Sequence, residues 1–203
     1  MAAMDRRAVI AGLVGCGLSP PAWAQVDPEP AFPERVAIGA ELRAAKPEIY
    51  DPAYVKLSYP MGDVADDRGV CADTIVRAFR HAGVDLQVLV HEDMAANFPT
   101  YPHLWGLTRP DRNIDHRRVP NLETFFQRRG GARVSSVRSA DYRPGDVVSW
   151  RLTGSGLPHI GVVTRRVEAG EPLVAHNIGA GTRMEPVLFA WPMAGWFRFA
   201  RWD

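Results

Sequence analysis

The sequence is short of cysteine, of excess charge and of long apolar runs, and each shortage excludes a class of protein. Only Cys16 and Cys71 occur in its 203 residues, too few for a domain that disulfides hold together. Lys and Arg number 24 against 23 Asp and Glu, and this net charge of +1 argues against a nucleic-acid partner. The 46% hydrophobic and 23% charged residues are typical of one soluble globular domain and exclude a disordered, collagen-like or multispan membrane chain.

Residues 1–24 carry the pattern of an export signal. The basic pair Arg6 and Arg7 precedes an apolar run over residues 8–18, which is shorter than the roughly 20 residues that span a bilayer. A Ser-Pro-Pro break follows, and Ala-Trp-Ala at 22–24 places small residues at the two positions that signal peptidase reads. The pattern therefore predicts a cleaved signal peptide with no integral membrane span.

Cleavage after Ala24 gives a periplasmic or secreted protein that starts at Gln25. A competing motif, Leu13-Val14-Gly15-Cys16, resembles a lipoprotein box and would instead attach a lipid to Cys16. Cleavage after Ala24 leaves Cys71 as the single cysteine of the mature chain. Such an unpaired cysteine is buried and inert, paired with another molecule, or reactive.

The mature chain reads as a proline-rich linker over residues 25–33 followed by one domain over residues 34–203. Apolar spacing and turn residues predict helices at 34–46, 73–82, 86–96 and 121–128, and a long loop at 99–120. The same signals predict strands at 54–59, 133–137, 146–152, 160–167, 172–176 and 196–202. Helices followed by antiparallel strands indicate an α+β domain with N-terminal helices packed on an antiparallel β-sheet.

Cys71 is placed at the start of a predicted helix. The free N–H groups and the dipole at a helix N-terminus favour a thiolate, and Gly69 permits a sharp turn into the helix. A small buried apolar cysteine is the alternative. Cys71 precedes the periodic apolar face of the helix, and this position favours a reactive cysteine whose pKa is lowered.

Two histidines sit at the ends of predicted strands. His159 opens the strand at 160–167, and His176 closes the next one. A cysteine at a helix start and histidines on two neighbouring strands supply a nucleophile, a base and an orienting group. We therefore expect Cys71, His159 and His176 to form a catalytic triad.

These blocks resemble the NlpC-type cysteine peptidases of the bacterial cell wall, which belong to the papain-like superfamily. That family places a cysteine at a helix start, then a Gly-Asp strand, here Gly145-Asp146, and then His-Ile/Val-Gly, here His159-Ile160-Gly161. A third polar residue, often histidine, lies on the following strand, here His176. The resemblance covers about residues 69–177, and it implies a papain-like fold and cleavage of an amide bond in peptidoglycan stem peptides.

The chain departs from that family at two points. Val70-Cys71-Ala72-Asp73 replaces the usual Asp-Cys-Ser-Gly, and the insertion between helix and sheet is long. The blocks at 69–73, 90–94 and 113–122 look more like an exported bacterial family of unassigned function. The changed cysteine block and the long insertion affect the inferred substrate more than the inferred reaction chemistry.

Two alternatives stay open. Residues 69–73 also resemble the nucleophile block of transglutaminase-like proteins, for which His103-Leu104-Trp105 and Asp115 would supply the partners of an acyl transferase or deamidase. The second alternative is a non-catalytic module that only binds cell-wall peptide.

The expected partner is a cell-wall peptide bound by a monomer. The backbone N–H of Cys71 would help to form the oxyanion hole, with Tyr59 as the second donor. Arg117 and Arg118 have the chemistry to clamp a substrate carboxylate. No metal or other cofactor is expected, because the six histidines show no close ligand spacing. The candidate substrate-contacting residues are Tyr59, Asp73, Trp105, Arg117 and Arg118.

Overall fold

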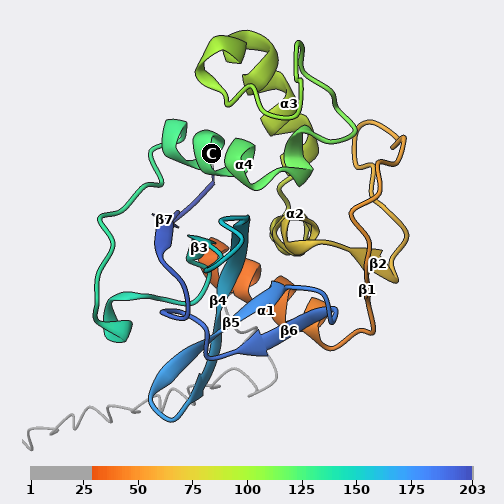
Figure 1. Ribbon diagram of the computed structural model, residues 1–203. Helices are drawn as coiled ribbons and strands as arrows, with labels where there is room; N and C mark the ends of the chain where they lie inside the picture. The colour runs from red at the N-terminus through yellow and green to blue at the C-terminus, as the bar shows by residue number, and fades with distance from the viewer. Residues whose placement is uncertain (1–28, 203) are drawn as a thin grey trace, which may run out of the picture.

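The computed structural model describes residues 29–202, so the predicted signal peptide, Cys16 and most of the predicted linker lie outside the described residues. Helices precede an antiparallel sheet, as predicted, and the α+β class is confirmed (Figure 1). The helices are α1 (Phe32–Ala44), α2 (Cys71–His81), α3 (Leu86–Asn97) and α4 (Val119–Arg128). Single-turn 3-10 helices span Phe98–Thr100, Asp115–Arg117 and Ser139–Asp141.

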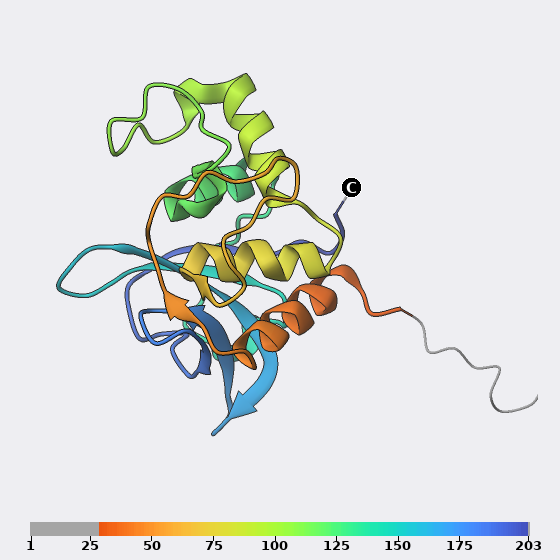
Figure 2. The same cartoon turned by 90° about the vertical axis from the view of Figure 1, so that its right-hand side faces the viewer.

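The main sheet is antiparallel, with the strand order β6-β5-β4-β3-β7. Its strands are β3 (Val147–Arg151), β4 (Pro158–Glu168), β5 (Glu171–Asn177), β6 (Thr182–Glu185) and β7 (Met193–Phe197). A separate parallel pair joins β1 (Ile49–Tyr50) to β2 (Arg68–Gly69), which leads directly into α2. Figure 2 shows α1 and α2 side by side next to the sheet, with α3 farthest from it. No helix within residues 29–202 has the length and apolar character needed to cross a bilayer.

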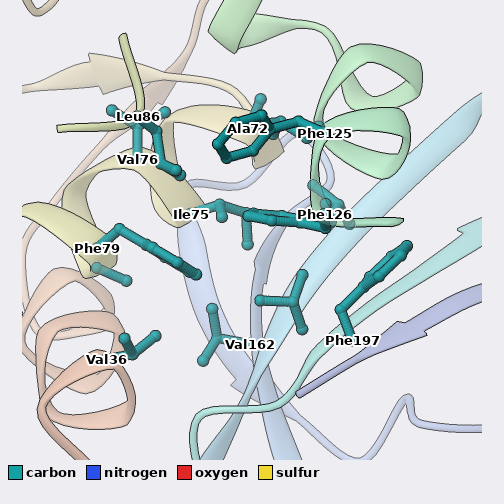
Figure 3. Packing of buried hydrophobic residues seen from close by; sticks show 14 of the residues in the cluster. Val36, Ala72, Ile75, Val76, Phe79, Leu86, Phe125, Phe126, Val162 and Phe197 are labelled. Carbon is teal, nitrogen blue, oxygen red and sulfur yellow. The ribbon is translucent and has the colours of Figure 1, made fainter. Parts of the chain in front are cut away.

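The core lies between α2, α4 and the sheet, where apolar side chains from distant segments meet (Figure 3). The rings of Phe79 and Phe126 stack with their centroids 5.4 Å apart, and both are fully buried. Burying one such side chain stabilises the fold by about 1.5–3 kcal/mol. Because Ile75, Val76 and Phe79 are spaced for one helical face, this core fixes α2, and with it Cys71, against the sheet.

Gly145 in the predicted Gly-Asp block has a structural reason to be glycine. Its φ is 86°, and a Cβ there would lie 2.1 Å from the carbonyl oxygen of Pro33. The neighbouring Asp146 is buried and accepts hydrogen bonds from Trp196 Nε1 at 2.8 Å and from Arg198 Nη2 at 2.7 Å. This block therefore anchors the start of β3 and contributes no side chain to the site described below.

Two predicted strands are wrong. Residues 54–59 are not in a strand: Tyr54 Oη donates to Asp111 and Leu57 N–H donates to Asn113, each at 2.9 Å, so this segment is bonded to loop side chains. Residues 133–137 also lack strand structure, and Val134 and Val137 are 91% and 93% exposed. Their β-branched residues have no neighbouring strand to pack against, and local side-chain bonds hold the loop instead.

Other helices and strands begin or end at residues different from the predicted ones. The first helix begins at Phe32, inside the predicted linker, and Leu42, which was expected on its apolar face, is 53% exposed. The predicted loop at 99–120 contains 3-10 turns and the start of α4, which begins at Val119. The last strand covers Met193–Phe197, earlier than the predicted 196–202, and β6 was not predicted.

Candidate active site

Cys71 is the first residue of α2 and lines a cleft of about 700 Å³. At the start of α2 the carboxylate of Asp73, the third helical residue, accepts a hydrogen bond of 2.7 Å from the N–H of Val70, the residue before the helix, as in half of a capping box. The cysteine is only 7% exposed. His159, at the start of β4, lines the same cleft, so the fold brings the predicted nucleophile and base to one site.

Three side chains on neighbouring strands form a hydrogen-bonded row. His159 Nε2 lies 2.9 Å from His176 Nδ1, and His176 Nε2 lies 2.9 Å from an Oε2 atom of Glu185. The residues come from β4, β5 and β6, which are adjacent in the sheet. Both histidines are almost fully buried, whereas the Glu185 side chain is 40% exposed. The row therefore leads from the cleft to the solvent.

Aromatic rings enclose the two histidines. The Trp150 ring stacks on His159 with centroids 5.7 Å apart, and its Nε1 donates to the Leu188 carbonyl at 3.0 Å. Trp191 meets both imidazoles edge-on, at 5.6 Å from His159 and 6.0 Å from His176. These contacts fix both ring planes and exclude water from the row.

Burial keeps both imidazoles neutral. Burial and, to a smaller extent, the neighbouring His176 lower the pKa of His159 to about 3. Burial also lowers the pKa of His176, although the Glu185 carboxylate opposes this effect. The histidines are therefore uncharged near neutral pH.

Neutrality fixes the direction of the hydrogen bonds along the row. A neutral imidazole has one donor and one acceptor nitrogen, and the ionised Glu185 carboxylate only accepts. His176 must then donate from Nε2 to Glu185, so its Nδ1 accepts from the Nε2–H of His159. This assignment leaves Nδ1 of His159 without a proton, as a general base requires.

The Cys71 thiol is neutral as well, against the expectation of a lowered pKa. Burial, helped by the Asp73 charge, raises the pKa of the thiol to about 12. The backbone N–H groups of Ile160, Ala72 and Cys71 itself act in the opposite direction. The helix N-terminus does favour the thiolate, but desolvation of a sulfur at the base of the cleft outweighs it.

Asp73 and Arg117, both predicted to contact substrate, bind each other. Arg117 donates from Nε and Nη2 to the two Asp73 oxygens at 2.8 and 3.0 Å, and from Nη1 to the Ala53 carbonyl at 3.1 Å. Both side chains are nearly inaccessible to solvent. Arg117 lines the cleft, but its guanidinium is already occupied by these partners.

Two of the other candidates reach the cleft and one does not. Trp105 and Arg118 line it. Tyr59 lies outside the lining, with its ring edge-on to His91 at 5.7 Å and under Arg112 at 5.5 Å. Its predicted place as an oxyanion donor is therefore not supported by its position.

His103, the base of the transglutaminase-like alternative, also lies outside the cleft lining. Its ring stacks on Phe98 with centroids 4.5 Å apart. Its expected partner Asp115 accepts a hydrogen bond from His91 at 3.0 Å. The structure thus places neither residue beside Cys71.

Sequence reasoning missed two residues beside the proposed triad. Glu185 ends a four-residue strand with no alternating pattern, so only the sheet register reveals it. Tyr50 lines the cleft, and its pKa is raised mainly by burial and also by the charge of Asp73. Tyr50 lies in a two-residue strand paired with β2, and a strand this short cannot be recognised from the sequence.

Within residues 29–202, no group of three or more His, Cys, Asp or Glu side chains is arranged to hold a metal ion. The chemistry that the cleft offers comes from a thiol, a neutral imidazole and backbone N–H groups. These are the parts of nucleophilic acyl transfer.

Comparison with known proteins places the chain among uncharacterised relatives. The model of a family described as a domain of unknown function, DUF1287, matches residues 37–199. The uncharacterized protein YijF of Escherichia coli (strain K12) is 56% identical over 165 residues, which cover 81% of this chain and 80% of that protein.

Solved structures similar to the chain include NlpC1 and NlpC2 from Trichomonas vaginalis. Their sequence identities are 14% and 16%, and their TM-scores are 0.46 and 0.47. The matches cover 87% and 89% of this chain but 47% and 50% of the two solved chains. The chain therefore spans about half the length of these structures.

Proposed function

The chain belongs to the DUF1287 family of domains of unknown function, and we propose that it is an exported cysteine hydrolase that cleaves an amide bond. The observation that carries the proposal is the hydrogen bond between the buried His176 and His159, which lines the same cleft as Cys71. In this proposal Cys71 is the nucleophile, His159 the general base and acid, and His176 the residue that positions His159.

The first half of the reaction forms a thioester. The Cys71 thiol gives its proton to Nδ1 of His159 while the sulfur bonds to the substrate carbonyl carbon. The carbonyl oxygen takes up negative charge, which backbone N–H groups at the start of α2 stabilise. The carbon–nitrogen bond then breaks, and His159 returns its proton to the departing amine.

The second half regenerates the enzyme. A water molecule gives a proton to His159 and adds its oxygen to the thioester carbon. The carbon–sulfur bond breaks, the sulfur takes the proton from His159, and the product leaves as a carboxylic acid. During both halves His159 carries a transient positive charge, which faces the Glu185 carboxylate through His176.

The proposed substrate is a peptidoglycan stem peptide. The expected export of the protein and the resemblance of its motifs to cell-wall peptidases support this choice. The cleft has room for an extended chain, because a second cavity of about 570 Å³ shares Pro120 and Pro158 with it.

Digestion of purified stem peptides by the mature protein tests the proposal. Mass spectrometry should show two products whose summed mass exceeds the substrate by one water. Cys71→Ala and His159→Ala should each lower turnover on the order of 10³-fold or more. His176→Ala should retain measurable activity, and adding it to His159→Ala should cause no further loss, because the residues act as a unit.

His103→Ala is the matched control, since it removes a histidine outside the cleft lining, and it should leave turnover unchanged. Peptides that bind but stay intact would favour the non-catalytic binding module. Products that carry an added amine in place of water would favour an acyl transferase.

A further inference from the structure

Arg118 lines the cleft with part of its guanidinium unused. The guanidinium carbon lies 4.7 Å from the centre of the Trp105 ring. Its Nη1 atom is buried and finds no hydrogen-bond partner among residues 29–202. A buried N–H of a charged group without a partner is costly, and such a group is expected to meet an acceptor when a ligand fills the site.

The charge of Arg118 is also not cancelled locally. The described residues that line the cleft include two arginines and no aspartate or glutamate, and the charge of Arg117 is matched by Asp73. Burial opposes ionisation of Asp111, but hydrogen bonds from Asn113 and Tyr54 lower its pKa, and the charge of Arg118 contributes less than they do. The oxygens of Asp111 are occupied by Tyr54 and Asn113. The cleft therefore presents one positive charge to its contents.

We propose that Arg118, held by Trp105, binds a carboxylate of the substrate, so that the enzyme acts on acidic peptides. This inference rests on the proposed function and names its substrate class. A guanidinium offers two parallel N–H groups that match the two oxygens of a carboxylate, and stacking on an indole fixes its plane without using those donors. The carboxylate belongs to the peptide near its scissile bond, because Arg118 and Cys71 line one cleft.

Stem peptides with free carboxyl groups, and the same peptides after chemical amidation of those groups, form a matched pair of probes. The wild-type protein should cleave the acidic peptides with a kcat/KM on the order of 10- to 100-fold higher, the effect of charge-assisted hydrogen bonds. In Arg118→Gln this ratio should fall toward one, mainly through KM on the acidic peptides. Arg118→Lys should keep part of the preference, since it keeps the charge but loses the planar fork.

Arg112→Gln is the control variant. Arg112 also stacks on an aromatic ring, that of Tyr59, but it lies outside the cleft lining. This variant should keep the wild-type ratio of kcat/KM values for acidic and amidated peptides. If it loses that ratio, the preference for acidic peptides comes from the overall charge of the protein. Equal cleavage of both peptides by the wild type would overturn the inference and leave the proposed function intact.

A binding measurement tests the role of Arg118 independently of the proposed reaction. Cys71→Ala protein, titrated by calorimetry, should bind the acidic peptides on the order of 10- to 100-fold more tightly than the amidated ones. Adding Arg118→Gln should remove the difference. If neither peptide is cleaved by the wild type, the proposed function fails, and this titration alone decides the inference: equal affinities would overturn it.

Discussion

Asp73→Ala removes a carboxylate two residues after Cys71 that pairs with the buried Arg117 guanidinium. The two side chains are 3% and 2% exposed, and two hydrogen bonds of 2.8 and 3.0 Å join them. The same carboxylate caps α2 through the Val70 N–H. The substitution therefore leaves a buried positive charge unpaired and an N-terminal donor unsatisfied.

Both losses lower the free energy of unfolding. Removing one partner of a buried ion pair costs about 3–5 kcal/mol, and losing a helix cap costs about 0.5–2 kcal/mol. A domain of this kind has a total stability of about 5–15 kcal/mol, so Asp73→Ala should lose a large fraction of it. The double variant Asp73→Ala/Arg117→Met should be more stable than Asp73→Ala alone, because no unpaired charge remains and the methionine fills part of the space.

Urea unfolding followed by circular dichroism measures these differences. Arg138→Ala is the control, since the Arg138 side chain is 76% exposed in its pair with Asp141, and its unfolding midpoint should match the wild type. If Asp73→Ala were as stable as the control but had lost binding of stem peptides, Asp73 would contact substrate after all. If the double variant were the least stable of the set, the unpaired-charge argument would be wrong.

Two further predictions concern the cysteines. Because burial raises the pKa of Cys71 to about 12, iodoacetamide should label native protein slowly at pH 6, and the labelling rate should rise about tenfold per pH unit through the alkaline range. Peptide mass spectrometry measures that rate, and rapid labelling at pH 6 would contradict the burial argument. The exported protein should begin at Gln25 and carry no lipid. Intact-mass measurement of secreted protein checks this, and an acylated Cys16 would show the lipoprotein route instead.

The helices were predictable because their signals are local. Helix α2 combines a capping carboxylate, apolar residues at helical spacing and a terminating Gly83 at φ 88°. The predicted span differs from the observed one by two residues at its start and one at its end. Whether a segment forms a strand depends on a neighbouring strand, which the local sequence does not indicate. In residues 133–137 only the N–H of Arg133 bonds to a strand, donating to the Trp196 carbonyl of β7, and the β-branched Val134 and Val137 are exposed. By contrast β6, with two charged residues among four, is a strand because β5 lies beside it.

The residues of the candidate site likewise include some that local sequence signals predict and some that they do not. Cys71, His159 and His176 each stand at the end of an element that is recognisable from the sequence, so their convergence could be predicted. The position of Tyr50 could not be predicted, because only the pairing of the two-residue β1 with β2 brings it to the cleft, whereas the predicted Tyr59 lies outside the lining. The pairing of Arg117 with Asp73, 44 residues away, likewise separates two adjacent arginines that look equivalent in the sequence.

The burial of the site determines how the proposed reaction begins. A thiol whose pKa is raised to about 12 and an imidazole whose pKa is lowered to about 3 do not form a resting ion pair. Proton transfer between them creates two charges in a site enclosed by indole rings, so it is favourable only while the sulfur bonds to a carbonyl carbon. The negative charge then moves to the substrate oxygen, and the positive charge on His159 faces Glu185 through His176. In the proposed reaction, the carboxylate that supports His159 as the base thus lies two hydrogen bonds away, on the strand that the sequence pattern did not reveal.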